Sequence, residues 1–85
     1  MRKIGRSRAD VADTIERFVD GICSQYEWDD FCSVPIIDFH LDAIRMRCAN
    51  LPKEFPPIER RHYCSPAGIE MLRQIVRQLR QPVAS

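Results

Sequence analysis

The stretch WDDFCSVPIIDFHLDAIRMRCANL, residues 28–51, decides the fold that we predict for this chain. It holds the only tryptophan, Trp28, and its second half places apolar residues on two sides of a helix. Asp38 is suited to cap that helix, because an aspartate at the N-cap accepts hydrogen bonds from the free amides of the first turn. The pattern predicts a helix over residues 39–50 that ends before Pro52, since proline cannot continue a helix.

The predicted helix 39–50 carries two apolar stripes at helical spacing. One stripe consists of Leu41, Ile44, Cys48 and Leu51. The other lies roughly opposite and consists of Phe39, Ala43 and Met46. A helix that is apolar on both sides is either covered by its own chain or shared with another molecule. The sequence leaves both explanations open, so these three residues are the first partner-binding candidates, for a protein partner or a homodimer.

Two further helices are predicted on either side of this stretch. Ser7 and Asp10 have the spacing of a capping box, which places the first helix at about residues 8–22. A serine followed by a proline marks the start of the last helix, at residues 66–80, because proline at the first helical position loses no amide bond. Each of these helices has a single apolar face, as is typical of surface helices.

The segments between the three helices are rich in proline and aromatic residues, and we expect two long ordered loops there. A minor two-stranded β element between residues 31–34 and 60–64 is compatible with this pattern. Residues 1–6 are predicted to be a flexible basic arm. Residues 7–85 then form a single small, all-α, three-helix domain, because a chain of 85 residues supports only one core.

The net charge of +1 conceals three blocks of unequal charge. Residues 1–8 carry +4, residues 9–42 carry −8, and the remainder carries +5. Such segregation indicates either contact between acidic and basic elements inside one fold, or two charged surfaces for partners. We favour the internal contact as the simpler interpretation.

The four cysteines, at positions 23, 32, 48 and 64, contain no CxxC pair and are irregularly spaced. Neither a zinc ribbon nor a disulfide framework is therefore predicted, and we expect no metal and no cofactor. No apolar run approaches the roughly 20 residues that span a membrane. The expectation is a soluble cytoplasmic protein with reduced thiols.

The acidic and aromatic run around Trp28, Asp29 and Asp30 is a second partner-binding candidate, because an exposed tryptophan offers a large contact area. The preferred interpretation is structural: Trp28 anchors a loop in the core while the acids stay in solvent. The two aspartates lack a third ligand or a phosphate-binding loop, so they are not expected to be catalytic.

The basic face of the last helix is the candidate for binding anions or nucleic acid, and it consists of Arg73, Arg77 and Arg80. Three observations count against it. The pI is 7.7, no aromatic residues alternate with these arginines, and a helix dipole already favours basic residues near a C-terminus.

Cys64 is the only candidate for a reactive thiol or a metal site. It lies before a helix N-terminus, close to two arginines, and such a setting lowers the pKa of a thiol. His62 is near in sequence, but two ligands do not make a zinc site. A buried, inert thiol is the simpler explanation.

The function predicted from the sequence is a non-enzymatic protein-interaction or regulatory module that self-associates through helix 39–50. A small nucleic-acid-binding regulator is the alternative, and a thiol-dependent enzyme or metal site at Cys64 is the third hypothesis. The sequence does not identify a biological process or a partner.

Overall fold

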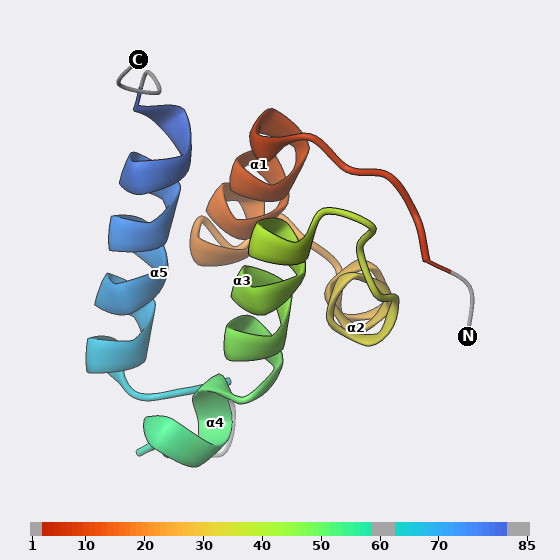
Figure 1. The fold of residues 1–85 in the computed structure, drawn as a ribbon. Helices are drawn as coiled ribbons and strands as arrows, with labels where there is room; N and C mark the ends of the chain where they lie inside the picture. Colours follow the sequence, from red (N-terminus) through yellow and green to blue (C-terminus); the bar gives the residue numbers. More distant parts are fainter. Residues whose placement is uncertain (1–2, 59–62, 82–85) are drawn as a thin grey trace.

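This computed structural model describes residues 3–58 and 63–81, and these residues contain five helices (Figure 1). In chain order they are α1 (Arg8–Val19), α2 (Gln25–Ser33), α3 (Phe39–Ala49), α4 (Leu51–Glu54) and α5 (Pro66–Arg80). The described residues form no strand, only one isolated bridge between Ile4 and Ile36. The all-α class predicted from the sequence is confirmed.

Helix α1 begins with the predicted capping box. The Ser7 hydroxyl accepts from the amide of Asp10, and the Asp10 carboxylate accepts from the amide of Ser7, each at 3.1 Å. The helix ends at Val19, before the predicted end near residue 22, because Gly21 turns the chain with a φ of 78°. Glycine adopts this left-handed conformation without steric cost.

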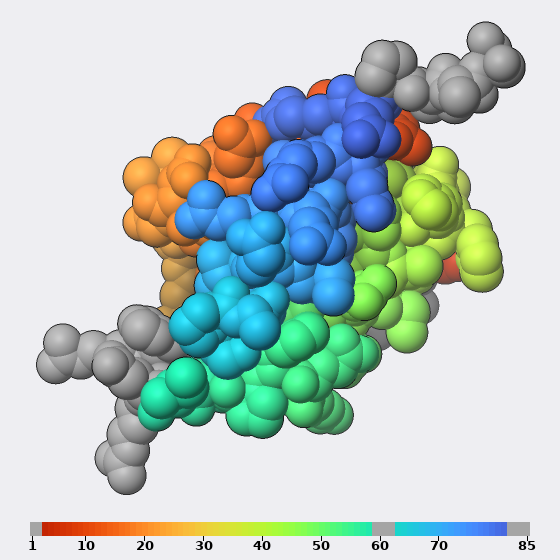
Figure 2. All heavy atoms as spheres, turned by 90° about the vertical axis from the view of Figure 1, so that its left-hand side faces the viewer, coloured from red at the N-terminus to blue at the C-terminus, as the bar shows by residue number. Residues whose placement is uncertain are grey.

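The longest helix, α5, packs beside α1 (Figures 1 and 2). Arg8 at the start of α1 donates to the carbonyls of Gln78 and Leu79, at 2.9 and 3.3 Å, in the last turn of α5, where helix carbonyls lack partners further along the helix. Buried Leu72, Ile75 and Leu79 form the inner face of α5. The predicted bounds of this helix, 66–80, are confirmed.

Residues 25–33 form α2, so the long loop predicted over this segment is wrong. Ser24 caps the helix by accepting from the amide of Glu27, and the helix stops at Ser33, shortly before Pro35. With nine residues, α2 is too short to show more than one apolar repeat. The predicted β element is also wrong for residues 31–33, which are helical. Its second strand is predicted at residues 60–64, of which residues 60–62 lie outside the described residues.

Aromatic residues pack around Trp28 in the core of the molecule. Its side chain is 2% exposed, Phe18 stacks on it, and Phe31 and Tyr63 pack around it. Trp28 is therefore the core anchor that the preferred interpretation of the sequence expects. Its helix α2 joins α1 to α3, and these elements share one core with α5.

The N-terminal residues lie against the connection between α2 and α3. Ile4 donates its amide to Pro35 and accepts from the amide of Ile37, at 3.0 and 2.9 Å. The Arg6 guanidinium carbon lies 5.5 Å from the centre of the Phe31 ring. The flexibility expected for residues 1–6 stays a prediction. None of the described helices is long and apolar enough to cross a membrane.

Candidate functional site

The outward-facing side of α3, formed by Phe39, Ala43, Met46 and Asn50, is the candidate site; we call these four residues the outer face of α3. Phe39 is 90% exposed and Met46 is 51% exposed, and the other two are also exposed. The opposite side of the helix is held in the core by Leu41 and Cys48. The described residues therefore leave the second apolar stripe of this helix largely uncovered.

Hydrogen bonds to the carboxylates of Asp38 and Asp42 hold the N-terminus of α3 in place. The Asp38 carboxylate accepts from the amide of Leu41 at 3.1 Å, which confirms the predicted cap. Asp42 Oδ1 accepts from the amide of Ile36 at 2.9 Å and from Arg45 Nε at 2.8 Å. These two hydrogen bonds, the one from Arg45 first, lower the pKa of Asp42 from its ordinary value of 3.8.

The other connections of α3 tie it to the core. Arg45 donates to the carbonyl of Cys32 at 2.6 Å, linking α3 to the end of α2. The Tyr63 hydroxyl donates to the carbonyl of Cys48 at 2.9 Å, at the C-terminal end of α3. The outer face is thus carried by an element whose two ends are both fixed, as suits a binding surface.

The apolar surface extends beyond the N-terminus of α3. Ile37 is 65% exposed and lies two residues before Phe39, whereas its neighbour Ile36 is 1% exposed and belongs to the core. Figure 2 shows the yellow-green residues of this region at the edge of the molecule, to the side of α5. Sequence reasoning missed Ile37, although the alternation of a buried and an exposed isoleucine around an extended connection could have indicated it.

Three of the sequence candidates, Trp28, Asp29 and Asp30, do not lie on one surface. Trp28 is buried, whereas both aspartates are exposed on α2. The acids are therefore open to a partner, whereas Trp28 is only 2% exposed, where it lines a cleft beside α2. The run does not form the exposed aromatic hot spot that the functional interpretation requires.

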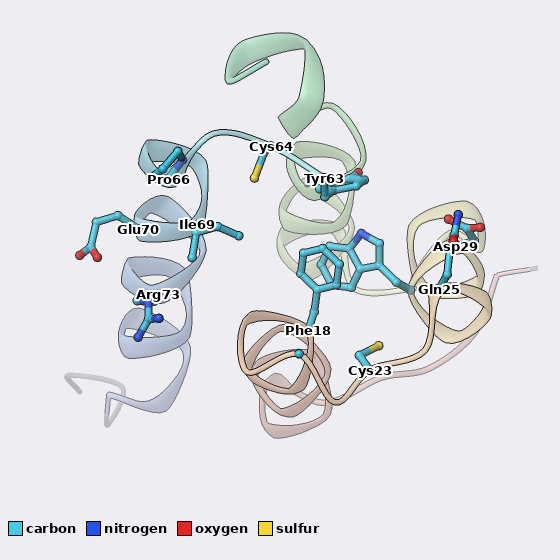
Figure 3. A pocket seen from close by; sticks show the side chains of 12 residues that line it. Phe18, Cys23, Gln25, Asp29, Tyr63, Cys64, Pro66, Ile69, Glu70 and Arg73 are labelled. Atoms are coloured by element: carbon cyan, nitrogen blue, oxygen red, sulfur yellow. The ribbon is translucent and has the colours of Figure 1, made fainter. Parts of the chain in front are cut away.

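An open cleft of about 1050 Å³ lies between the end of α1, α2, Tyr63 and the start of α5 (Figure 3). Phe18, Tyr63 and Ile69 border it, with Asp29 on one side and Arg73 on the other. The walls combine aromatic and aliphatic side chains with the polar side chains of Gln25, Asp29, Glu70 and Arg73.

Cys64 also borders this cleft, but its side chain is only 2% exposed. Burial raises the pKa of its thiol, the direction opposite to the one that a reactive thiolate needs. His62 lies outside the described residues. Among residues 3–58 and 63–81, no three histidine, cysteine or acidic side chains gather in a way that could hold a metal ion.

The basic candidates of α5 are exposed, and two of them contact acids. Arg80 donates to Glu16 at 2.7 Å and lies 3.6 Å from Asp13, both on α1. Arg77 lies 3.3 Å from Glu70, and Arg73 borders a hollow that Glu16 and Asp20 also line. Contact between the acidic α1 and the basic α5 supports the internal interpretation of the charge blocks.

Comparison with protein-family models, with curated proteins and with solved structures found no match for this chain. The function is therefore argued from the residues themselves.

Proposed function

We propose that this protein is a non-enzymatic interaction module that binds a protein partner through the outer face of α3. The observation that carries the proposal is the 90% exposure of Phe39 on a helix whose opposite side is buried. A second partner-binding candidate, Met46, lies two turns along the same outer face, with Ala43 between them.

The energetics favour a covered outer face. Burying a phenylalanine or methionine side chain stabilises a complex by about 1.5–3 kcal/mol relative to leaving it in water. A few residues at the centre of an interface commonly supply most of the binding energy, provided that surrounding residues exclude water. Phe39 is suited to the central position, with Ile37 and Met46 beside it.

Affinity capture with matched variants tests this function. Wild type, Phe39→Asp and Tyr26→Asp would be used as bait in extracts of the cells that make the protein. Tyr26 is 83% exposed on α2, so its variant introduces the same charge at a different exposed aromatic residue. We expect a protein recovered with wild type and Tyr26→Asp to be lost with Phe39→Asp. Equal recovery with all three baits would contradict the proposal.

The alternative function, a nucleic-acid-binding regulator, relies on Arg73, Arg77 and Arg80. Two of them lie beside acids, which reduces the positive potential that phosphates would meet. Fluorescence anisotropy with mixed-sequence DNA and RNA at low salt tests this alternative. Binding that weakens steeply with added salt, and that is lost in Arg73→Ala, would favour it over the proposed function.

A further inference from the structure

We infer that the partner of the outer face of α3 is a second copy of this chain, docked with the two α3 helices parallel about a twofold axis. This inference rests on the proposed function, because it names the occupant of the same surface. It is carried by the spacing of the exposed residues and by the charges beside them.

The outer face has the spacing of a coiled-coil seam. Phe39, Ala43, Met46 and Asn50 follow one another at steps of four, three and four residues, which is the d–a–d–a pattern of a heptad repeat. All four are exposed. In this register Leu41 and Cys48 occupy positions opposite the seam, where they are buried in their own chain. A single helix thus packs inward on one side and presents a regular seam on the other.

Charges beside the seam favour a second copy and set its direction. Asp42 occupies position g on one flank, and Arg47, five residues later, occupies position e on the other. In a parallel pair, position g of one helix lies beside the following position e of its partner. Each Asp42 would then lie beside the Arg47 of the other copy, and the twofold axis would form this pair twice.

Asp42 already forms an ion pair with Arg45 of its own chain through Oδ1, so its other oxygen would accept from Arg47 of the second copy. Both of the hydrogen bonds that it accepts from the described residues, from Ile36 and Arg45, are to Oδ1. Its side chain is 24% exposed, and Arg47 is exposed on the opposite flank. In an antiparallel pair about a twofold axis, the flank that carries position e would lie beside the same flank of the other copy. Arg47 would then lie near His40 of the other copy, which is also at position e, and not near Asp42.

Asn50 is consistent with the parallel arrangement. A polar asparagine at position a favours a parallel, two-stranded register in coiled coils, because the two amides can pair across the axis. Asn50 is the C-cap of α3, so this pair would close the seam at the end of the helix.

The size of the seam predicts a weak, reversible dimer. Helix α3 has 11 residues, and at 1.5 Å per residue it is about 16 Å long. A stable interface commonly buries about 800 Å² on each partner, and a helix of this length provides only part of that area. Exposed Ile37 extends the surface, and the dimer is expected to form at high protein concentration.

Sedimentation equilibrium over a wide concentration range tests the dimer. Arg47→Glu places two acids together twice, so we expect it to raise the dissociation constant by about tenfold. Arg73→Glu makes the same charge change on α5 and should leave the constant unchanged. A strict monomer at every concentration, or equal effects of both variants, would overturn the inference.

Cysteine cross-linking tests the direction of the helices. Ala43→Cys and Asn50→Cys each place a thiol at position a. In a parallel pair the new cysteine of each variant lies opposite the same cysteine of the other copy, and we expect oxidised glutathione to join the two in a disulfide. In an antiparallel pair the twofold axis can pass close to only one of these positions. Wild type, with its four native cysteines, gives the background. Self-linking at only one position, or at neither, would contradict the parallel arrangement.

The two proposals can fail separately. If Phe39→Asp abolishes capture of another protein while wild type sediments as a strict monomer, the interaction function holds and the second copy is excluded. If wild type dimerises and Phe39→Asp dimerises equally well, the outer face of α3 is not the dimer surface and the second-copy inference fails. The interaction function then fails only if affinity capture also gives equal recovery with Phe39→Asp.

Discussion

The ring of Phe18 lies flat against the indole of Trp28, with ring centroids 3.8 Å apart and planes inclined by 11°. This stacked pair joins the end of α1 to α2 at the centre of the core. It explains why the only tryptophan is a structural residue, although it lies in a conspicuously acidic run.

Trp28→Ala is expected to destabilise the protein by about 3–5 kcal/mol, the usual loss for a large buried aromatic residue. Small domains have little stability to spare, so Trp28→Phe, which keeps a ring, provides a milder second variant. Urea unfolding followed by far-UV circular dichroism measures both. Tyr26→Ala, at an exposed site, should change the free energy of unfolding by less than about 0.5 kcal/mol. Similar losses at positions 26 and 28 would contradict the assigned core.

Gly68→Ala is expected to destabilise α5, although alanine is the better helix former by about 1 kcal/mol. A Cβ at this position would lie 2.8 Å from Cys64 Sγ and 3.1 Å from Phe55 Cβ, and overpacking of this kind costs about 1–3 kcal/mol. Gly5→Ala meets no atom within 4 Å and is the control. In a Cys64→Ala background, Gly68→Ala should cost less, because the closest contact is gone. Stabilisation by Gly68→Ala alone would disprove the close packing.

Stability should decrease as the pH falls below about 4, in part through Asp42. Its hydrogen bonds hold its pKa below the ordinary value of 3.8 in the folded protein. The stabilisation is therefore complete above that value, and it is lost as the pH falls through the lower pKa of the folded state. Asp42→Asn should flatten this acid limb, as measured by urea unfolding from pH 2 to 6. An unchanged slope would show that Asp42 does not contribute.

The buried thiols of Cys48 and Cys64, and the partly buried thiol of Cys32, should react slowly in the folded protein. Burial raises the pKa of Cys48 to about 12 and that of Cys32 to about 11, and it also raises the pKa of Cys64. Little thiolate is then present at neutral pH, so labelling with a disulfide reagent should accelerate strongly in denaturant. Mass spectrometry assigns each site. Rapid labelling of native Cys64 would revive the thiol-enzyme hypothesis.

Local signals in the sequence predicted the helices whose N-termini are marked by capping residues or by proline. Ser7 with Asp10, Asp38, and Ser65 with its following proline locate the starts of α1, α3 and α5. Helix α2 has a serine cap too, but nine residues give its apolar positions too little length to repeat. Its identity as a helix is set by packing of Trp28 and Phe31 into the core, which is a tertiary effect.

The candidate site could be predicted only in part. The two apolar stripes of α3 are visible in the sequence, but which stripe faces the core depends on how α1, α2 and α5 fill the space around the other one. The exposed Ile37 depends on the path of the chain after Pro35, where Ile36 turns inward. Periodicity alone contains neither piece of information.

A dilution series of two-dimensional amide spectra of the isotope-labelled protein tests the central claim most directly, because it reports association residue by residue without any mutation. We expect concentration-dependent shifts and broadening confined to Ile37, Phe39, His40, Ala43, Met46, Arg47 and Asn50. Spectra that do not change with concentration, or changes centred on the arginines of α5, would contradict self-association through the outer face of α3.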